Sequence, residues 1–274
     1  MRCAALLALI AVCACAGAQP ALPVRAHRMV SLMPSFTEDL CAVGARGEIV
    51  AVSKYSQDIA CAAGLPVVSD YAAVDTERVV ALRSDLVVGI PAQSALVSPL
   101  RRLRIPVLLL PNDSFASIFT NIARLGSLTG HERNASRLIG GLKARTARLV
   151  ASERFSRRPS VFFVVQALPL WTTGRSSYIT SLLKLAGATN AVQAAQAYLQ
   201  YSAEALLARQ PDAIVAASDA GLAGVLNREP WRSLRAVRAH RVYILGNAAL
   251  IVRPGPRYNE GLSWLIDRLR PLAT

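Results

Sequence analysis

The sequence ERNASRLIGGLKARTARLVASERF, from Glu132 to Phe155, predicts the element around which this chain is organised. Apolar residues recur in it at helical spacing and arginines fill the opposite face, which is typical of an amphipathic helix. Thr129 fits a capping box with Glu132, and Pro159 lies just beyond the other end. A helix of this length spans about 36 Å, the width of a small domain. We therefore expect one long helix that bridges two parts of the protein.

Two segments, one on each side of this helix, repeat the same pattern. They are VDTERVVALRSDLVVGI, which begins at Val74, and YSAEALLARQPDAIVAA, which begins at Tyr201. Aligned without a gap, they superimpose four pairs of residues: Glu77 on Glu204, Ala81 on Ala208, Asp85 on Asp212 and Val88 on Val215. Each copy predicts a short helix with an acidic first turn, followed by a buried strand. The repeat indicates two lobes of related construction.

Apolar strands and helical patterns alternate along the rest of the chain, which indicates βαβ crossovers and mainly parallel sheets. The 274 residues, 53% of them hydrophobic, suffice for two modest domains with buried cores. We therefore predict an α/β fold of two lobes joined by one long helix. The expected parts are a signal peptide at residues 1–18, an amino-terminal ligand-binding lobe at 26–128, the interlobe helix at 129–158 and a carboxyl-terminal ligand-binding lobe at 159–274.

The start of the chain is typical of a secretory signal. Arg2 precedes an apolar run from Ala4 to Ala16, and small residues follow up to Ala18, where cleavage is expected. A membrane anchor fits less well, because the run is shorter than the ~20 residues of a spanning helix. Val12 to Cys15 loosely resembles a lipobox, so a lipoprotein anchored through Cys15 is the alternative. Both interpretations place the mature protein outside the cytoplasm, and we predict a periplasmic location.

Charge and cysteine content restrict the partners. The formal net charge is +14, most of it from arginines scattered over many segments. No nucleic-acid-binding motif accompanies this charge in an exported chain, so we expect no nucleic-acid partner and a basic surface that could attract anionic ligands or membranes. Cys41 and Cys61 remain once the signal is removed. A disulfide between them and two buried free thiols both stay open.

Catalytic and metal-binding motifs are missing from the sequence. The three histidines, His27, His131 and His240, have no nucleophile nearby in the predicted fold. No G-x-S-x-G elbow, P-loop or G-x-G-x-x-G loop is present. The spacing of histidine and cysteine suits no zinc site. We therefore predict a binding protein rather than an enzyme, with no cofactor and no metal site.

The expected ligand site follows from the architecture. In open α/β sheets ligands bind beyond the carboxyl ends of the strands, and two facing lobes bring these ends together across one cleft. Four aromatic side chains are expected on loops that follow strands: Tyr55, Tyr71, Trp171 and Tyr198. Their flat faces suit a large planar or macrocyclic ligand. Ser35, Phe36 and Arg253 complete the candidate set.

Six segments in order give the chain a family resemblance. They are RMVSLMPSFTEDLCAVGA from Arg28, VDTERVVALRSDLVV from Val74, the interlobe helix, PLWTTG from Pro169, YSAEALLARQPDAIV from Tyr201 and GPRYNEGL from Gly255. With them the chain resembles the helical-backbone class of periplasmic substrate-binding proteins that serve ABC importers. The resemblance implies capture of a small molecule between two lobes and its delivery to a permease dimer with its ATPase. An exported sensor or enzyme on the same lobes is a further alternative.

Within this class the chain looks most like the cobalamin-binding members. SLMPSFTE and VSKYSQD are similar to their opening and place Tyr55 at an aromatic ligand contact. Tyr71 and Tyr198 stand where those proteins have tryptophans. Trp171 falls near another aromatic contact, and Arg253 lies in a loop that resembles their ligand loop. The family's cysteine-aspartate-tyrosine-proline run is replaced here by SQDI. The resemblance implies cobalamin or a related corrinoid as ligand, with a ferric siderophore or haem as the alternative.

The two repeated glutamates acquire a role from the same resemblance. In the family, one surface glutamate on each lobe docks onto arginines of the permease subunits, and Glu77 and Glu204 match those positions. A first-turn glutamate is also favoured by the helix dipole alone, by about 0.3–1 kcal/mol. Glu38 differs, because a capping box with Ser35 would explain it. The stiff interlobe helix implies that the lobes close by only a small motion.

Overall fold

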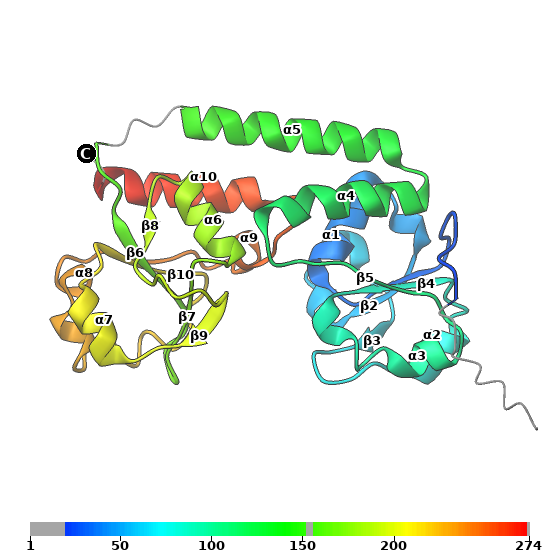
Figure 1. Cartoon of the computed structure of the whole chain (residues 1–274), viewed down its shortest axis with the longest axis horizontal. Coiled ribbons are helices and arrows are strands. Elements are labelled where there is room, and N and C mark those ends of the chain that lie inside the picture. Colours follow the sequence, from blue (N-terminus) through cyan, green and yellow to red (C-terminus); the bar gives the residue numbers. More distant parts are fainter. Residues whose placement is uncertain (1–19, 152–155, 273–274) are drawn as a thin grey trace, which may run out of the picture.

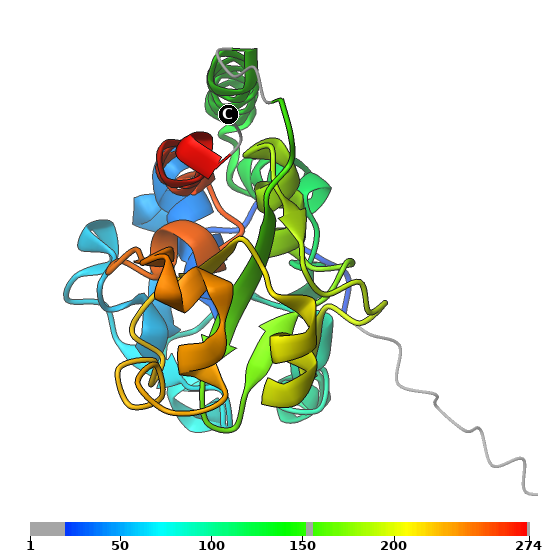
Figure 2. The ribbon, with the colours of Figure 1, turned by 90° about the vertical axis from the view of Figure 1, so that its left-hand side faces the viewer.

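Two lobes lie side by side beneath one long helix (Figure 1). The protein is represented by a computed structural model that describes residues 20–151 and 156–272. The long helix is α5 (Glu132–Ala151), with 20 residues, and Figure 2 shows it nearly end-on above the rest of the molecule. The predicted helical run continued to Phe155, but residues 152–155 lie outside the described chain.

The amino-terminal lobe is a five-stranded sheet in the order β3-β2-β1-β4-β5, and every pairing in it is parallel. Its strands are β1 (Met29–Ser31), β2 (Ile49–Ser53), β3 (Val67–Ser69), β4 (Leu86–Gly89) and β5 (Val107–Leu109). Its helices are α1 (Pro34–Val43), α2 (Thr76–Ala81), α3 (Ser98–Arg102) and α4 (Phe115–Thr129). The central strands β1 and β4 are buried throughout, as short apolar runs in a parallel sheet must be.

The carboxyl-terminal lobe has a sheet in the order β11-β10-β6-β7-β9, with β8 also paired to β6. Its strands are β6 (Ser160–Gln166), β7 (Trp171–Thr173), β8 (Thr189–Asn190), β9 (Tyr198–Gln200), β10 (Ala213–Ala216) and β11 (Val242–Ile244). Its helices are α6 (Tyr178–Leu185), α7 (Ala203–Arg209), α8 (Arg235–Arg238), α9 (Ala249–Val252) and α10 (Tyr258–Leu269). Among the described strands the antiparallel pairings are those of β7 with β6 and of β7 with β9. The predicted α/β class with mainly parallel sheets is confirmed.

One hydrophobic core runs through both lobes. It includes Met29 and Phe36 from the amino-terminal lobe and Phe163 from the carboxyl-terminal lobe. At the junction, the ring of Tyr258 on α10 meets the ring of Phe115 on α4 edge to face, with centroids 5.0 Å apart. A shared apolar core resists separation of the lobes, because opening would expose this surface to water.

Hydrogen bonds tie α5 to each lobe separately. On the amino-terminal side, Asn134 Nδ2 donates to the carbonyl of Val43 at 2.9 Å. On the carboxyl-terminal side, the hydroxyls of Thr146 and Tyr258 share a hydrogen bond of 2.5 Å. Asn259 Nδ2 donates to the carbonyl of Leu142 on α5 at 3.0 Å. The bridging helix is therefore fixed at both ends, which supports the expectation of a small closing motion.

The predicted capping box at the start of α5 is wrong. Thr129 is the last residue of α4, and its hydroxyl donates to the carbonyl of Leu125 at 2.8 Å. Gly130, with φ of 72°, ends α4 in the left-handed conformation that glycine adopts at low cost. The helix C-cap signal of Gly130 thus outweighs the N-cap signal of Thr129, and α5 begins separately at Glu132.

Two further features concern covalent and membrane attachment. The structure joins Cys41 on α1 to Cys61 by a disulfide, with Cα atoms 6.3 Å apart, within the usual range for such a bond. This favours the disulfide over two free thiols. In the described chain, no helix has both the length and the apolar character needed to cross a bilayer.

Candidate ligand cleft between the lobes

Two cavities lie where the carboxyl ends of the strands of the two lobes face each other. One, of about 200 Å³, is lined by both lobes, with Ser35, Tyr55 and Tyr71 on one side and Arg253 on the other. The second, of about 140 Å³, lies against the carboxyl-terminal lobe and includes Tyr198. Ala248 and Val252 line both cavities, so α9 separates two parts of one cleft.

The amino-terminal wall of the cleft carries a stacked pair of tyrosines. The rings of Tyr55 and Tyr71 lie 4.2 Å apart between centroids, with 24° between their planes. Tyr71 is 63% exposed and Tyr55 39%. Burial, together with the neighbouring Tyr55, raises the pKa of Tyr71, although Arg253 opposes the shift. The pair offers a flat apolar face, and the hydroxyl of Tyr71 is neutral at physiological pH.

Polar groups lie beside this aromatic face. Ser35 is buried at the start of α1, and its hydroxyl accepts a hydrogen bond from Asn112 Nδ2 at 2.9 Å. Asn112 Oδ1 is buried and accepts no hydrogen bond from any described residue. Since a buried unpaired acceptor is unfavourable, this oxygen is suited to a donor on a ligand. The set of contacts proposed from the sequence included Ser35 and did not include Asn112.

Arg253 connects the two lobes across the cleft. It follows α9 in the carboxyl-terminal lobe, and its guanidinium donates to Glu38 at 3.1 Å and to Asp58 at 2.9 Å. It also donates to the carbonyl of Tyr55 at 3.1 Å. Burial raises the pKa of Glu38 despite the pairing, whereas the two carboxylates raise the pKa of Arg253 against its own burial. In this conformation Arg253 donates three hydrogen bonds to protein acceptors.

The structure corrects the expectation for Glu38. The predicted capping box required Glu38 to bond the backbone near Ser35, but α1 begins at Pro34 and Met33 precedes it without a side-chain cap. Glu38 is instead buried and accepts from Arg253. Proline at the first helical position has no N–H group that a side chain could cap. The partner of Glu38 in the ion pair, Arg253, lies 215 residues away in the sequence.

Phe36 does not belong to the cleft. Its side chain is completely buried in the core beneath α1. Ser35 and Phe36 are adjacent on a helix, where consecutive side chains point about 100° apart, so only Ser35 faces the cavity. The prediction that Phe36 contacts a ligand is therefore wrong for this arrangement.

Trp171 and Tyr198 lie on strands, not on loops as predicted. In the antiparallel pair of β7 and β9, Trp171 is opposite Gln200 and Thr173 is opposite Tyr198. Successive side chains of a strand point to opposite faces, so Trp171 and Thr173 share one face of the sheet. Tyr198, directly opposite Thr173, lies on the same face as Trp171. Tyr198 is 48% exposed, and burial together with the Asp113 carboxylate of the other lobe raises its pKa. Trp171 is 37% exposed and lines neither cavity.

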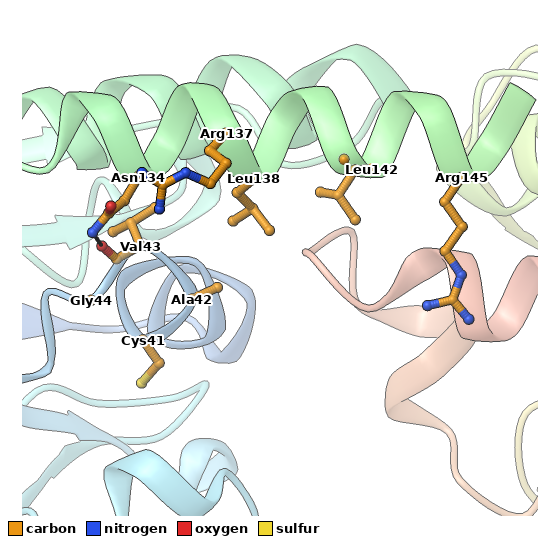
Figure 3. A pocket seen from close by; sticks show the side chains of 10 residues that line it. Cys41, Ala42, Val43, Gly44, Asn134, Arg137, Leu138, Leu142 and Arg145 are labelled. Carbon is orange, nitrogen blue, oxygen red and sulfur yellow. Dashed lines mark hydrogen bonds between the residues drawn. The ribbon is translucent and has the colours of Figure 1, made fainter.

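A larger cavity, of about 580 Å³, lies elsewhere, between the end of α1 and α5 (Figure 3). Arg137 and Arg145 lie toward its two ends, with Leu138 and Leu142 between them. This cavity lies between two helices and not beyond the carboxyl ends of the strands, where ligands bind in open α/β sheets. We therefore place the ligand site in the cleft. Residues 20–151 and 156–272 contain no group of three or more His, Cys, Asp or Glu side chains able to hold a metal ion.

The repeated glutamates occupy equivalent positions. Glu77 and Glu204 are each the second residue of a short helix, α2 and α7, and both are exposed. Each helix has a side-chain cap: Asp75 accepts from the backbone N–H of Arg78, and Ser202 from that of Ala205. Both helices lie on the side of the molecule away from α5 (Figure 1). The geometry agrees with a common docking face, and the docking role stays a prediction.

Comparisons with known proteins agree with this architecture. A family model described as periplasmic binding protein matches residues 29–249. An uncharacterized ABC transporter substrate-binding lipoprotein of Bacillus subtilis, YvrC, is 30% identical over 260 residues, which cover 89% of this chain and 80% of the relative. The crystal structure of the periplasmic vitamin B12 binding protein BtuF of Vibrio cholerae superimposes with a TM-score of 0.79 at 25% identity, covering 91% of this chain and 98% of BtuF. A periplasmic heme binding protein from Pseudomonas aeruginosa superimposes with a TM-score of 0.80 at 27% identity, covering 90% and 94% of the two chains.

Proposed function

This chain belongs to the periplasmic binding protein family and is a non-catalytic substrate-binding protein of an ABC transporter, and we propose that its ligand is cobalamin or a related corrinoid. The bound molecule would lie between the lobes and be delivered to a permease dimer that the ATPase drives. The contacts proposed are Ser35, Tyr55, Tyr71, Tyr198 and Arg253, with Trp171 at the edge.

The stacked pair of Tyr55 and Tyr71 is the observation that carries this proposal. Together with Tyr198 on the opposite wall, the pair provides flat apolar faces on both sides of one cleft. Such faces contact a macrocycle over a large area. The two cavities are smaller than the roughly 300–1,000 Å³ typical of ligand sites. A corrinoid would therefore have to displace the Tyr55 loop or the Arg253 loop, while the shared core holds the lobes in place.

Haem, or a ferric siderophore, is the second candidate ligand. Tyr71 is largely exposed and lines the cleft, and a tyrosine oxygen can bind ferric iron in place of a histidine. Burial raises the pKa of Tyr71 and disfavours the phenolate, but a bound metal ion releases the proton. The similarity to the Pseudomonas aeruginosa heme binding protein supports this alternative equally well.

Glu77 and Glu204 are proposed as the residues that dock onto the permease. Their equivalent positions on α2 and α7 support this role, since both carboxylates would be presented on the face opposite α5. We also propose export to the periplasm after cleavage at Ala18, with a lipid anchor at Cys15 as the alternative. The name of the Bacillus subtilis relative, a lipoprotein, supports the second form.

The decisive test is a titration of the mature protein with cyanocobalamin, haem and a ferric siderophore. Tryptophan fluorescence and calorimetry would report binding, with Tyr71→Phe as a matched variant. We expect saturable one-to-one corrinoid binding that Tyr71→Phe retains, because stacking needs the ring and not the hydroxyl. Haem binding that Tyr71→Phe abolishes, with no corrinoid binding, would overturn the corrinoid and assign Tyr71 to iron.

A further inference from the structure

The amino-terminal sheet has an outer edge where its strands begin, on the side away from the ligand cleft. This outer edge is lined by arginines. Strands β1, β4 and β5 are neighbours in this sheet, and an arginine lies in the turn before each of them. Two of these, Arg83 and Arg104, have left-handed backbones with φ of 49° and 58°. We define the arginine edge as the following five residues: Arg28, Arg83, Arg101, Arg102 and Arg104. The fold thus gathers five guanidinium groups that the sequence distributes over more than seventy residues.

These charges are not neutralised by ion pairs. Within residues 20–151 and 156–272, no carboxylate lies at salt-bridge distance from any of the five guanidinium groups. Arg28 donates to the carbonyl of Leu82 at 2.8 and 3.0 Å, and Arg101, whose Nε is buried, donates to the hydroxyl of Ser94 at 3.3 Å. The nearby Asp85 accepts the backbone N–H groups of His27 and Arg28 instead of a guanidinium. The arginine edge therefore keeps its positive charge.

The equivalent edge of the other lobe differs in this respect. Asp212 corresponds to Asp85 in the sequence repeat, and it pairs with Arg157 at 3.1 Å and Arg235 at 2.9 Å. Arg232 is paired with Glu229. The carboxyl-terminal lobe thus pairs two of the arginines at its outer edge with Asp212, whereas none of the five arginines of the arginine edge has a carboxylate partner among the described residues.

Exposed apolar side chains accompany the unpaired arginines. Leu103 lies between Arg102 and Arg104 and is 56% exposed, and Val80 on α2 is 46% exposed. Arginine combined with exposed aliphatic groups suits the interface of an anionic bilayer, where guanidinium groups meet phosphates and apolar groups enter the headgroup layer.

The chain enters the fold at this same edge. His27 and Arg28 are bonded to the turn before β4, and Figure 1 shows the first described residues at the end of the lobe that carries α2 and α3. Cys15 precedes the first described residue, Pro20, by five positions. An extended chain of that length reaches about 17 Å. A lipid on Cys15 would therefore place the arginine edge against the membrane.

We propose that the arginine edge is a membrane-docking surface that binds anionic phospholipid headgroups. It holds the protein at the membrane on which the permease is found, with or without a lipid on Cys15. The binding is electrostatic, so it weakens with salt, because the Debye length falls from about 10 Å at 0.1 M to about 3 Å at 1 M. This proposal concerns a surface remote from the cleft and does not depend on which ligand the cleft binds.

The test uses the unlipidated chain that begins at Gln19, sedimented with vesicles of phosphatidylcholine alone or with added phosphatidylglycerol. We expect binding only to the anionic vesicles, and loss of it at high salt. Arg83→Glu, Arg102→Glu and Arg104→Glu combined, all at exposed positions, should weaken binding at least tenfold. The matched control reverses three exposed arginines of the other lobe, Arg209, Arg228 and Arg238, with the same change in net charge.

Equal weakening by the control would overturn the proposal, since it would show that total charge and not the edge governs binding. Binding to neutral vesicles as strong as to anionic ones would also overturn it, as would binding to an oligonucleotide but to no vesicle. If the triple variant unfolds, Leu103→Ser and the single Arg102→Glu variant test the same surface with smaller changes. Each should weaken vesicle binding without altering ligand titration, and unchanged binding in both would refute the edge.

Discussion

The two copies of the sequence repeat, α2 with β4 and α7 with β10, share a backbone but not their contacts. In both, a side-chain cap starts the helix, a glutamate occupies its second position and an aspartate precedes the strand. Asp85 accepts two backbone N–H groups of the incoming chain, whereas Asp212 accepts one, from Ser160, and pairs with two arginines. The repeat determines where a carboxylate lies, and the surrounding non-repeated sequence determines what it binds.

The cleft shows the same contrast. The amino-terminal lobe presents Tyr55 and Tyr71 as a stacked pair on loops, whereas the carboxyl-terminal lobe presents Trp171 and Tyr198 from paired strands. Arg253 reaches from the second lobe to the first through Glu38 and Asp58. The two walls of the cleft therefore present their aromatic side chains from different kinds of structure, while the glutamates on α2 and α7 remain alike.

The largest expected effect tests the feature in which the lobes agree. Glu77→Arg combined with Glu204→Arg should abolish uptake of the ligand, because each lobe would repel the permease arginines that it is proposed to contact. Ligand affinity, measured by calorimetry, should stay unchanged. Glu132→Arg is the control, since Glu132 is also an exposed first-turn glutamate but lies on α5. Normal uptake in the double variant would remove the docking role.

Asp212→Asn tests the feature in which the repeats differ. Burial opposes ionisation of Asp212, but the Ser160 N–H and the guanidinium of Arg157 lower its pKa below the usual value, with further help from Arg235. Because this pKa is lower in the folded state, the ionised Asp212 stabilises the protein at pH values above the unfolded-state pKa of about 3.9. This stabilisation is lost as the pH falls through the folded-state pKa. We expect Asp212→Asn to cost about 2 kcal/mol at neutral pH, measured by urea unfolding.

Asp85→Asn is the partner of that experiment. It removes a charge that accepts only backbone N–H groups, so a loss of about 1 kcal/mol is expected. The deficit of Asp212→Asn should shrink as the pH falls below about 4 and vanish below the lowered folded pKa, where the wild-type carboxyl is protonated in both states. A deficit of Asp212→Asn that is independent of pH, or smaller than that of Asp85→Asn, would contradict the assigned pairing.

The aromatic contacts should differ in weight between the lobes. Tyr71→Ala removes one ring of the stacked pair and should weaken binding of the ligand about tenfold, or about 1.4 kcal/mol. Trp171→Ala should weaken it less, because Trp171 lines neither cavity. Calorimetric titration of both variants with the ligand identified for the wild type gives the ratio. A larger loss at Trp171 would move the site toward β7 and β9.

Most of the architecture could be predicted from local patterns. Apolar runs bounded by Pro34 and Pro91 mark β1 and β4, and Ser114, a typical helix cap, caps α4. Gly44 ends α1 with φ of 90°. Such signals lie within a few residues of the element that they define, so one sequence contains them. The three-residue strands β7 and β9 were missed, because a run of three residues shows no periodicity and their pairing is established only in the fold.

The site was predictable in position and less so in its contacts. Ser35, Tyr55, Tyr71, Tyr198 and Arg253 all surround the cleft, as expected from the rule that ligands bind beyond strand ends. The ion pair of Arg253 with Glu38 spans 215 residues, and no local pattern indicates it.

The smallest effect concerns how α5 is attached to each lobe. Thr146→Val keeps the shape of the side chain but removes the hydroxyl that bonds Tyr258 and Asn259, and we expect a loss of about 1 kcal/mol. Asn134→Ala removes the bond to Val43 on the other lobe, where the side chain is half-exposed, and should cost less. Chemical unfolding measures both losses. Since the shared core and not these bonds fixes the lobes, small-angle scattering of either variant should show the same dimensions as the wild type, with little compaction on ligand addition. A large compaction in the wild type would instead mean that the lobes rotate about α5, and that the core between Phe115 and Tyr258 opens in solution.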